Sequence, residues 1–163
     1  MTKISFFGDF HPKIPSQSSL VCRRIFIYHT MTKGILCTID FSEASRQALL
    51  WAVQFSKMQG SDLTILYTYR LTKNMTGEAV VWKKKMEEEA LQKFAVFENE
   101  WLKMAGIKYE FKIEVGFVAD RVEDHTQKSD ISFLVMDKNM CSQSKDTFDD
   151  LMEHMNVPLV IIP

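Results

Sequence analysis

The side chains that most often do chemistry in proteins are few in this sequence and stand far apart. The cysteines are Cys22, Cys37 and Cys141, and none belongs to a CxxC pair. Three cysteines with such wide gaps favour reduced thiols over a disulfide framework or a zinc site. The four histidines are also scattered, and GxGxxG, GxxxxGK[ST], GxSxG and HExxH are all absent. We therefore expect no catalytic residues, no metal site and no enzyme activity.

One carboxylate stands where a ligand could bind. Asp40 directly follows the apolar run at residues 35–39 and is followed by Ser42. An acid in that place could bind a nucleotide base, a ribose or a magnesium ion. It could equally help Ser42 to cap a helix, since Ser42 is a good N-cap and Glu43 suits the positive end of a helix dipole. The residues around Asp40 leave both roles open.

Short apolar runs and amphipathic helices alternate along most of the chain. We expect strands at residues 35–39, 63–69, 108–115, 131–136 and 157–162. We expect helices from Ser42 to the C-cap at Gly60, from about residue 79 to 105, at 118–128 and at 147–155. Residues 139–144 are polar and predict a loop. Repeated β–α units of this length indicate a parallel sheet with helices on both faces.

The composition limits the partners that the chain can attract. It has 163 residues, 46% of them hydrophobic, and a net charge of −1, which fits one ordinary globular domain. A near-neutral chain has no overall field that would draw it to nucleic acid or to an anionic membrane. No apolar run approaches the ~20 residues of a membrane span. We expect a cytoplasmic protein with neither partner.

The first thirty residues differ from the rest. They hold Lys3, Lys13, Arg23 and Arg24 against Asp9 alone, together with two prolines and a run of serines. The segment lacks the features of a secretory signal. We expect a poorly ordered extension at residues 1–30 or a start codon placed too early, with translation beginning at Met31.

Three segments share features with one known family. Residues 35–45 form a strand followed by Asp-Phe-Ser and a helix with small residues, residues 129–136 read Ser-Asp-Ile-Ser-Phe-Leu-Val-Met, and residues 156–162 read Asn-Val-Pro-Leu-Val-Ile-Ile. Together they resemble the universal stress protein family over residues 31–163. The resemblance implies a flavodoxin-like, doubly wound five-stranded parallel sheet in the order 3-2-1-4-5. It also implies a homodimer, paired through the strand that begins at Val157 and ends at Ile162.

The resemblance also raises the question of ATP, which some members bind and others do not. Binders carry Gly-x2-Gly-x9-Gly-Ser/Thr after the fourth strand, where glycines and a helix N-terminus let backbone N–H groups reach phosphate. Here Asp137 and Met140 stand at the first two glycine positions, and no glycine occurs from Phe117 to the end. We therefore expect that this chain does not bind ATP in the family's usual way.

Strands one and four flank the topological switch point, where ligands of such sheets bind. The candidate nucleotide crevice consists of five residues: Thr38, Asp40, Tyr67, Met136 and Asp137. Two carboxylates there would repel a polyphosphate, each by up to ~4 kcal/mol at ~4 Å and an effective dielectric of ~20. They could hold a divalent metal, but we expect Asp137 to be a solvent-exposed loop acid.

These observations predict a non-enzymatic stress-response or regulatory domain that acts as a dimer and has no cofactor. The alternative is an ATP- or AMP-binding switch that uses Asp40 and a rebuilt loop at residues 137–146. Methionines also gather near the C-terminal elements, at positions 136, 140, 152 and 155. Filling a core is their most common role, and an adaptable contact surface is the alternative.

Overall fold

The computed structural model describes residues 33–71, 79–142 and 145–163, with the backbone alone for 141, 142, 145–147 and 150. Five strands form one all-parallel sheet in the order β3-β2-β1-β4-β5. The strands are β1 (Gly34–Ile39), β2 (Leu63–Tyr69), β3 (Tyr109–Val115), β4 (Ile131–Asp137) and β5 (Leu159–Ile162). The predicted fold class and strand order are confirmed. The predicted extension at residues 1–30 lies outside the described residues.

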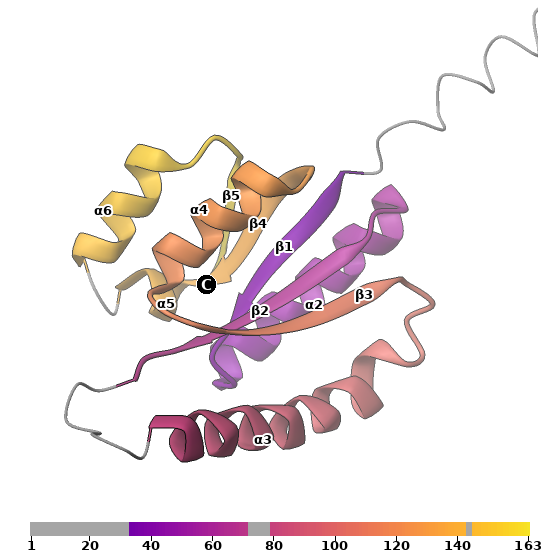
Figure 1. Cartoon of the computed structure of the whole chain (residues 1–163). Helices are drawn as coiled ribbons and strands as arrows, with labels where there is room; N and C mark the ends of the chain where they lie inside the picture. The colour runs from indigo at the N-terminus through magenta and orange to yellow at the C-terminus, as the bar shows by residue number, and fades with distance from the viewer. Residues whose placement is uncertain (1–32, 72–78, 143–144) are drawn as a thin grey trace, which may run out of the picture. The chain divides into compact units, whose positions relative to one another are not determined.

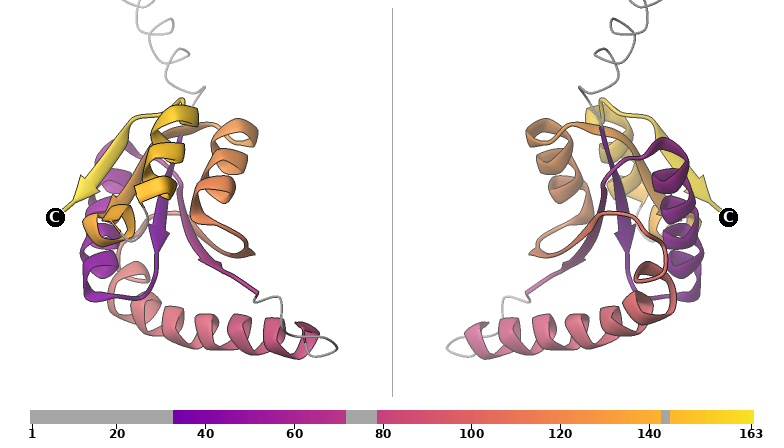
Figure 2. Two further views of the ribbon diagram at one scale, coloured as in Figure 1. Left: turned by 90° about the vertical axis from the view of Figure 1, so that its left-hand side faces the viewer. Right: turned by 90° about the vertical axis from the view of Figure 1, so that its right-hand side faces the viewer.

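Helices cover both faces of this sheet. They are α2 (Glu43–Gln59), α3 (Ala79–Phe97), α4 (Val118–Lys128), α5 (Lys138–Ser142) and α6 (Lys145–His154), and a π-helical turn, η1 (Glu98–Leu102), continues α3. The sheet separates α2 and α3 from α4 and α6 (Figures 1 and 2). Among the described residues, no helix combines the length and the apolar character that a bilayer crossing requires.

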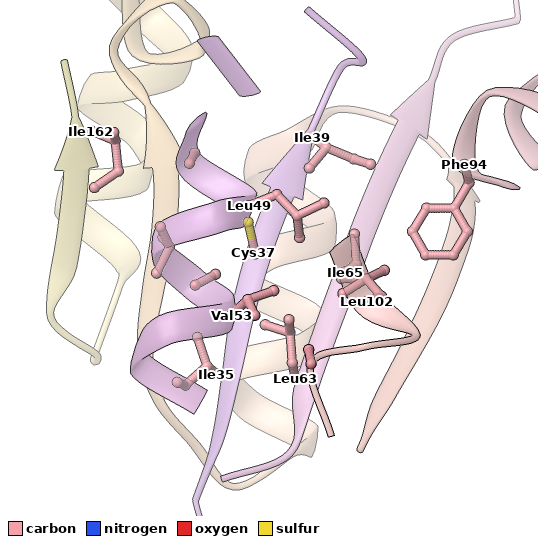
Figure 3. Close-up of a cluster of buried hydrophobic side chains, with 14 residues drawn as sticks. Ile35, Cys37, Ile39, Leu49, Val53, Leu63, Ile65, Phe94, Leu102 and Ile162 are labelled. Atoms are coloured by element: carbon pink, nitrogen blue, oxygen red, sulfur yellow. The ribbon is translucent and has the colours of Figure 1, made fainter. Parts of the chain in front are cut away.

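Alternation along β1 supplies side chains to two cores. Ile35, Cys37 and Ile39 pack with residues of α2 such as Leu49 in one cluster (Figure 3). Leu36 packs on the opposite face with residues of α4 and α6. Because successive side chains of a strand point to opposite faces, an uninterrupted apolar run is the pattern of a strand covered on both sides. Each fully buried aliphatic side chain stabilises the fold by about 1.5–3 kcal/mol.

Both predicted ends of α2 are confirmed. The Ser42 hydroxyl accepts the backbone N–H of Ser45 at 3.1 Å, which caps the first turn. Gly60 has a φ of 64° and donates its N–H to the carbonyl of Ser56. A residue without a side chain adopts this left-handed conformation at no steric cost, so Gly60 ends the helix.

Two of the predicted elements differ from the structure. Residues 139–142 belong to helix α5 and not to a polar loop. The long helix predicted to reach residue 105 is α-helical only to Phe97 and then widens into the π-helical turn. In that turn Glu98 accepts a hydrogen bond from the Tyr109 hydroxyl at 2.7 Å, which ties the turn to β3.

Candidate functional site

A cavity of about 340 Å³ lies where the carboxyl ends of β1, β2 and β4 meet the elements that follow them. Polar and apolar groups both contribute to its walls, and the apolar part includes Phe117, Val118, Met136, Met140, Phe148 and Leu151. Among the described residues that line it, Asp40 and Arg70 carry a charge. In sheets of this kind the crevice beyond the carboxyl ends at the switch point is the usual ligand site. This cavity is therefore the candidate site.

Hydrogen bonds hold Asp40 just before the N-terminus of α2. Its Oδ1 atom accepts the backbone N–H of Ser42 at 2.8 Å. Partial burial alone would raise the pKa of Asp40, but hydrogen bonds from Ser42 and Ser45 outweigh that effect and hold the pKa below its usual value. Asp40 therefore presents a carboxylate to the cavity at neutral pH and also supports the start of α2. The second of its two predicted roles is confirmed, and ligand binding stays a prediction.

Phe41, between Asp40 and Ser42, has an unusual backbone conformation. Its φ of 64° places a non-glycine residue in the left-handed region, which is sterically costly. The ring compensates by packing against Tyr67 and Phe97, with centroid distances of 4.8 and 5.7 Å. Aromatic packing on the α3 side of the sheet therefore fixes the turn that orients Asp40.

Asp137 is not the solvent-exposed loop acid that we expected. It is the last residue of β4 and is fully buried. Its Oδ1 atom accepts the backbone N–H groups of Asn139 at 2.8 Å and Met140 at 3.0 Å, so it caps α5. Its Oδ2 atom is buried and has no hydrogen-bond partner among the described residues.

Asp137 faces away from the cavity. Val135 belongs to the core on the α2 side and Met136 to the core on the α4 side. Alternation along β4 therefore turns Asp137 to the α2 side. Burial and the nearby charge of Asp137 both raise the pKa of the Cys37 thiol, which points to that same side.

Three of the five predicted crevice residues, Asp40, Tyr67 and Met136, line the cavity. Asp137 and Thr38 are buried and do not line it. The Thr38 hydroxyl has no hydrogen-bond partner among the described residues. Its position explains this difference, because Thr38 lies inside β1, one residue before the last residue of the strand, and is covered there.

Sequence reasoning missed Arg70 and Phe117. The Arg70 guanidinium carbon lies 5.3 Å from the centroid of the Phe117 ring, a cation–π contact. Arg70 forms no ion pair with any described residue. A signal for both was present, since Arg70 directly follows β2 and Phe117 lies two residues after β3, on the edge of the sheet that Asp40 occupies.

Within the described ranges, no three His, Cys, Asp or Glu side chains come close enough to hold a metal ion.

A model of the universal stress protein family matches residues 31–163, which is most of the chain. The chain belongs to the universal stress protein family. No curated protein matches it in sequence. The matched residues include every strand and helix described above, so members of the family are the proteins with which this structure is compared.

Solved structures of this family share the fold at low sequence identity. A universal stress protein from Burkholderia pseudomallei has 17% identity and a TM-score of 0.64, and the match covers 81% of this chain and 97% of that one. UspA from Lactobacillus plantarum has 19% identity and a TM-score of 0.65, with coverage of 83% and 100%. A protein from Archaeoglobus fulgidus in complex with dAMP has 16% identity and a TM-score of 0.56, with coverage of 80% and 97%.

Proposed function

We propose that this chain is a regulatory, non-enzymatic universal stress protein that does not bind ATP through the segment after β4 and that acts as a homodimer. The proposal that the segment after β4 does not bind ATP rests on the two hydrogen bonds that the backbone N–H groups of Asn139 and Met140 donate to Asp137. Family members that bind ATP use glycines after the fourth strand. In this chain an aspartate stands at the first of those positions.

The hydrogen bonds bear directly on phosphate binding. A helix N-terminus attracts phosphate because its first N–H groups lack partners inside the helix. At α5, two of these groups already bond to Asp137. A phosphate would have to displace a carboxylate that is covalently part of the preceding residue and therefore always present. The competition is intramolecular, and it favours Asp137.

The charges in the cavity also disfavour the binding of ATP. The lowered pKa of Asp40 keeps a carboxylate at the cavity wall. A like charge within ~4 Å of a phosphoryl oxygen would cost up to ~4 kcal/mol at an effective dielectric of ~20. Arg70 is the one cation among the described residues of the cavity wall, and one flexible side chain does not match the charge of a triphosphate.

Calorimetric titration of the purified chain with ATP and Mg²⁺ tests this part of the proposal. We expect no saturable heat and no change in melting temperature. A ligand at a hundred times its Kd would stabilise the folded state by ~2.7 kcal/mol, which a thermal scan detects easily. Micromolar binding would contradict the proposal, whichever residues supplied it.

The second candidate is an adenine-nucleotide switch that holds AMP or ATP through Asp40 and a rearranged segment at residues 137–146. Two observations favour it: the cavity at the switch point, and solved family members in complex with cAMP and with dAMP. AMP carries less charge than ATP, so it meets less repulsion from Asp40. Titration with AMP, in parallel with ATP, distinguishes the two candidates.

The dimer is proposed to form at the free edge of β5. This strand is at one end of the sheet, where its outer backbone groups have no partner strand among residues 33–71, 79–142 and 145–163, and Ile161 is exposed on it. Light scattering should report twice the monomer mass. Ile161→Lys should lower that mass to the monomer value, whereas Met104→Lys, a change at a highly exposed residue outside β5, should not.

A further inference from the structure

Helices α4 and α6 lie side by side on one face of the sheet (Figure 1). Residues of both helices line a groove. The groove has a volume of about 160 Å³ and lies apart from the cavity beside Asp40, although Leu151 borders both. Its apolar lining is supplied by Ala119, Val122, Leu151 and Met155. Val122 and Leu151 are core residues, so the floor of the groove is part of the fixed interior.

The volume of the groove limits the size of the group that it can bind. Sites for drug-sized molecules and cofactors usually measure ~300–1,000 Å³, well above this volume. The space is suited to a single aliphatic side chain. Met155 borders it, and a thioether side chain adapts its shape to what it contacts. The groove therefore fits one anchoring residue of a larger partner.

The rim of the groove is acidic. Asp120 and Glu123 stand on its α4 side, and His154 stands on its α6 side. Neither acid forms an ion pair with a described residue, and the hydrogen bond that Glu123 accepts at 2.8 Å comes from the neutral amide of Gln127. Both carboxylates can therefore meet an external cation without first releasing an internal one.

The basic residues of α4 cannot neutralise this rim, because they lie on another side of the helix. Arg121 and Lys128 each bond to Asp124 at 2.9 Å. These three residues line a different cleft, towards β3, that neither Asp120 nor Glu123 borders. On the side of α4 that faces this cleft, the charged residues form ion pairs with one another. On the side that faces the groove, Asp120 and Glu123 form no ion pair with a described residue.

We propose that the groove between α4 and α6 docks a short basic segment of a partner protein. One Leu, Ile or Met side chain of that segment enters the space between Ala119 and Met155, and a neighbouring Lys or Arg lies beside Asp120 and Glu123. Opposite charges across such a contact guide association and set the orientation, while the buried apolar anchor supplies most of the affinity. Nucleotides and anionic lipids are repelled by the same rim. The proposal does not depend on whether the other cavity binds ATP.

A selection from random peptides tests the pattern. The full chain is immobilised and offered a library of random twelve-residue peptides displayed on phage, and the Ala119→Leu variant is used to remove binders that ignore the groove. Leu at position 119 fills the groove from a helix that accepts leucine readily. We expect the enriched peptides to share one Leu, Ile or Met next to Lys or Arg.

Fluorescence anisotropy with a labelled peptide of the selected consensus then measures each contribution. Ala119→Leu should weaken binding at least about tenfold, as the loss of an anchor pocket does. The double variant Asp120→Asn/Glu123→Gln, which leaves the shape intact, should weaken it roughly fivefold and reduce its sensitivity to salt. Glu88→Gln, at an exposed acid on α3, should change nothing.

Three results would overturn the proposal. One is enrichment of no peptides, or of peptides without the basic and aliphatic pattern. Another is equal binding to the wild type and to Ala119→Leu, provided that circular dichroism shows the variant to be folded. The third is a change of oligomeric mass in Ala119→Leu by light scattering, since the occupant would then be a second copy of this chain.

Discussion

The carboxyl ends of β1 and β4 each carry an aspartate whose Oδ1 atom accepts the backbone N–H two residues later, at 2.8 Å in both cases. Asp40 is half-buried and borders the cavity, whereas Asp137 is fully buried and faces the α2 side. The difference arises because Asp40 follows its strand while Asp137 is still the last residue of one. A shift of a single residue along a strand moves a side chain to the other face.

The consequences for ligand binding are opposite. The turn after β1 leaves a charged group accessible from the cavity and stores backbone strain at Phe41. The turn after β4 uses its aspartate to satisfy the first N–H groups of a helix. Two similar local motifs therefore give one carboxylate that borders a cavity and one that caps a helix.

The largest expected effect concerns Phe41. Phe41→Ala removes a ring that packs against Tyr67 and Phe97 and should lower the free energy of unfolding by about 2–3 kcal/mol. Phe41→Gly should be about 1 kcal/mol milder than the alanine variant, because glycine tolerates the left-handed φ. At the other end Lys138, whose φ is not positive, should behave in the opposite way, with Lys138→Gly about 0.5–1 kcal/mol less stable than Lys138→Ala.

Urea denaturation of the four variants measures these differences. If glycine were worse than alanine at both positions, the strained turn after β1 would not exist, and the contrast between the two strand ends would be lost.

A smaller effect is expected at Asp137. Asp137→Asn keeps an oxygen that can accept the N–H groups of Asn139 and Met140, whereas Asp137→Ala removes it. We therefore expect the alanine variant to be about 1–2 kcal/mol less stable than the asparagine variant, the usual range for loss of a helix N-cap. Thermal or urea unfolding of the pair provides the measurement. Equal stabilities would mean that the cap hydrogen bonds contribute nothing, and α5 would then have another origin.

The smallest effect is a dependence on pH at Asp40. Its pKa is lower in the folded chain than in the unfolded chain, so its contribution to stability is present above the unfolded pKa of about 3.9 and is lost as the pH falls through the folded value. The stability difference between the wild type and Asp40→Asn should therefore shrink between pH 5 and pH 3. A difference that stayed constant, or grew, on acidification would contradict the hydrogen-bonded carboxylate described for Asp40.

Much of the fold could be predicted because it depends on local signals. The uninterrupted apolar run of β1, the N-cap at Ser42 and the C-cap at Gly60 are each set by a few neighbouring residues, and all three are where the sequence indicates. The strand order could be predicted only through the family resemblance, because nothing in the sequence of β3 or of β5 indicates an edge strand.

The parts that could not be predicted depend on contacts between distant residues. Asp137 is buried because it is still the last residue of β4 and faces the core on the α2 side. The sequence around it does not indicate that β4 extends this far, so the prediction of an exposed loop acid was wrong. Helix α5 was missed for the same reason, because its cap is a buried strand residue. Arg70 and Phe117 come together from the ends of β2 and β3, whereas the predicted crevice took only Tyr67 from β2 and no residue from β3.

The central claim is that Asp137 occupies the backbone groups that would otherwise hold phosphate. The most direct test is a titration of isotope-labelled protein with ATP and Mg²⁺, followed through the amide resonances of Asn139 and Met140. We predict that these two resonances keep their positions up to millimolar nucleotide. Saturable shifts of both resonances at micromolar ATP would contradict the claim.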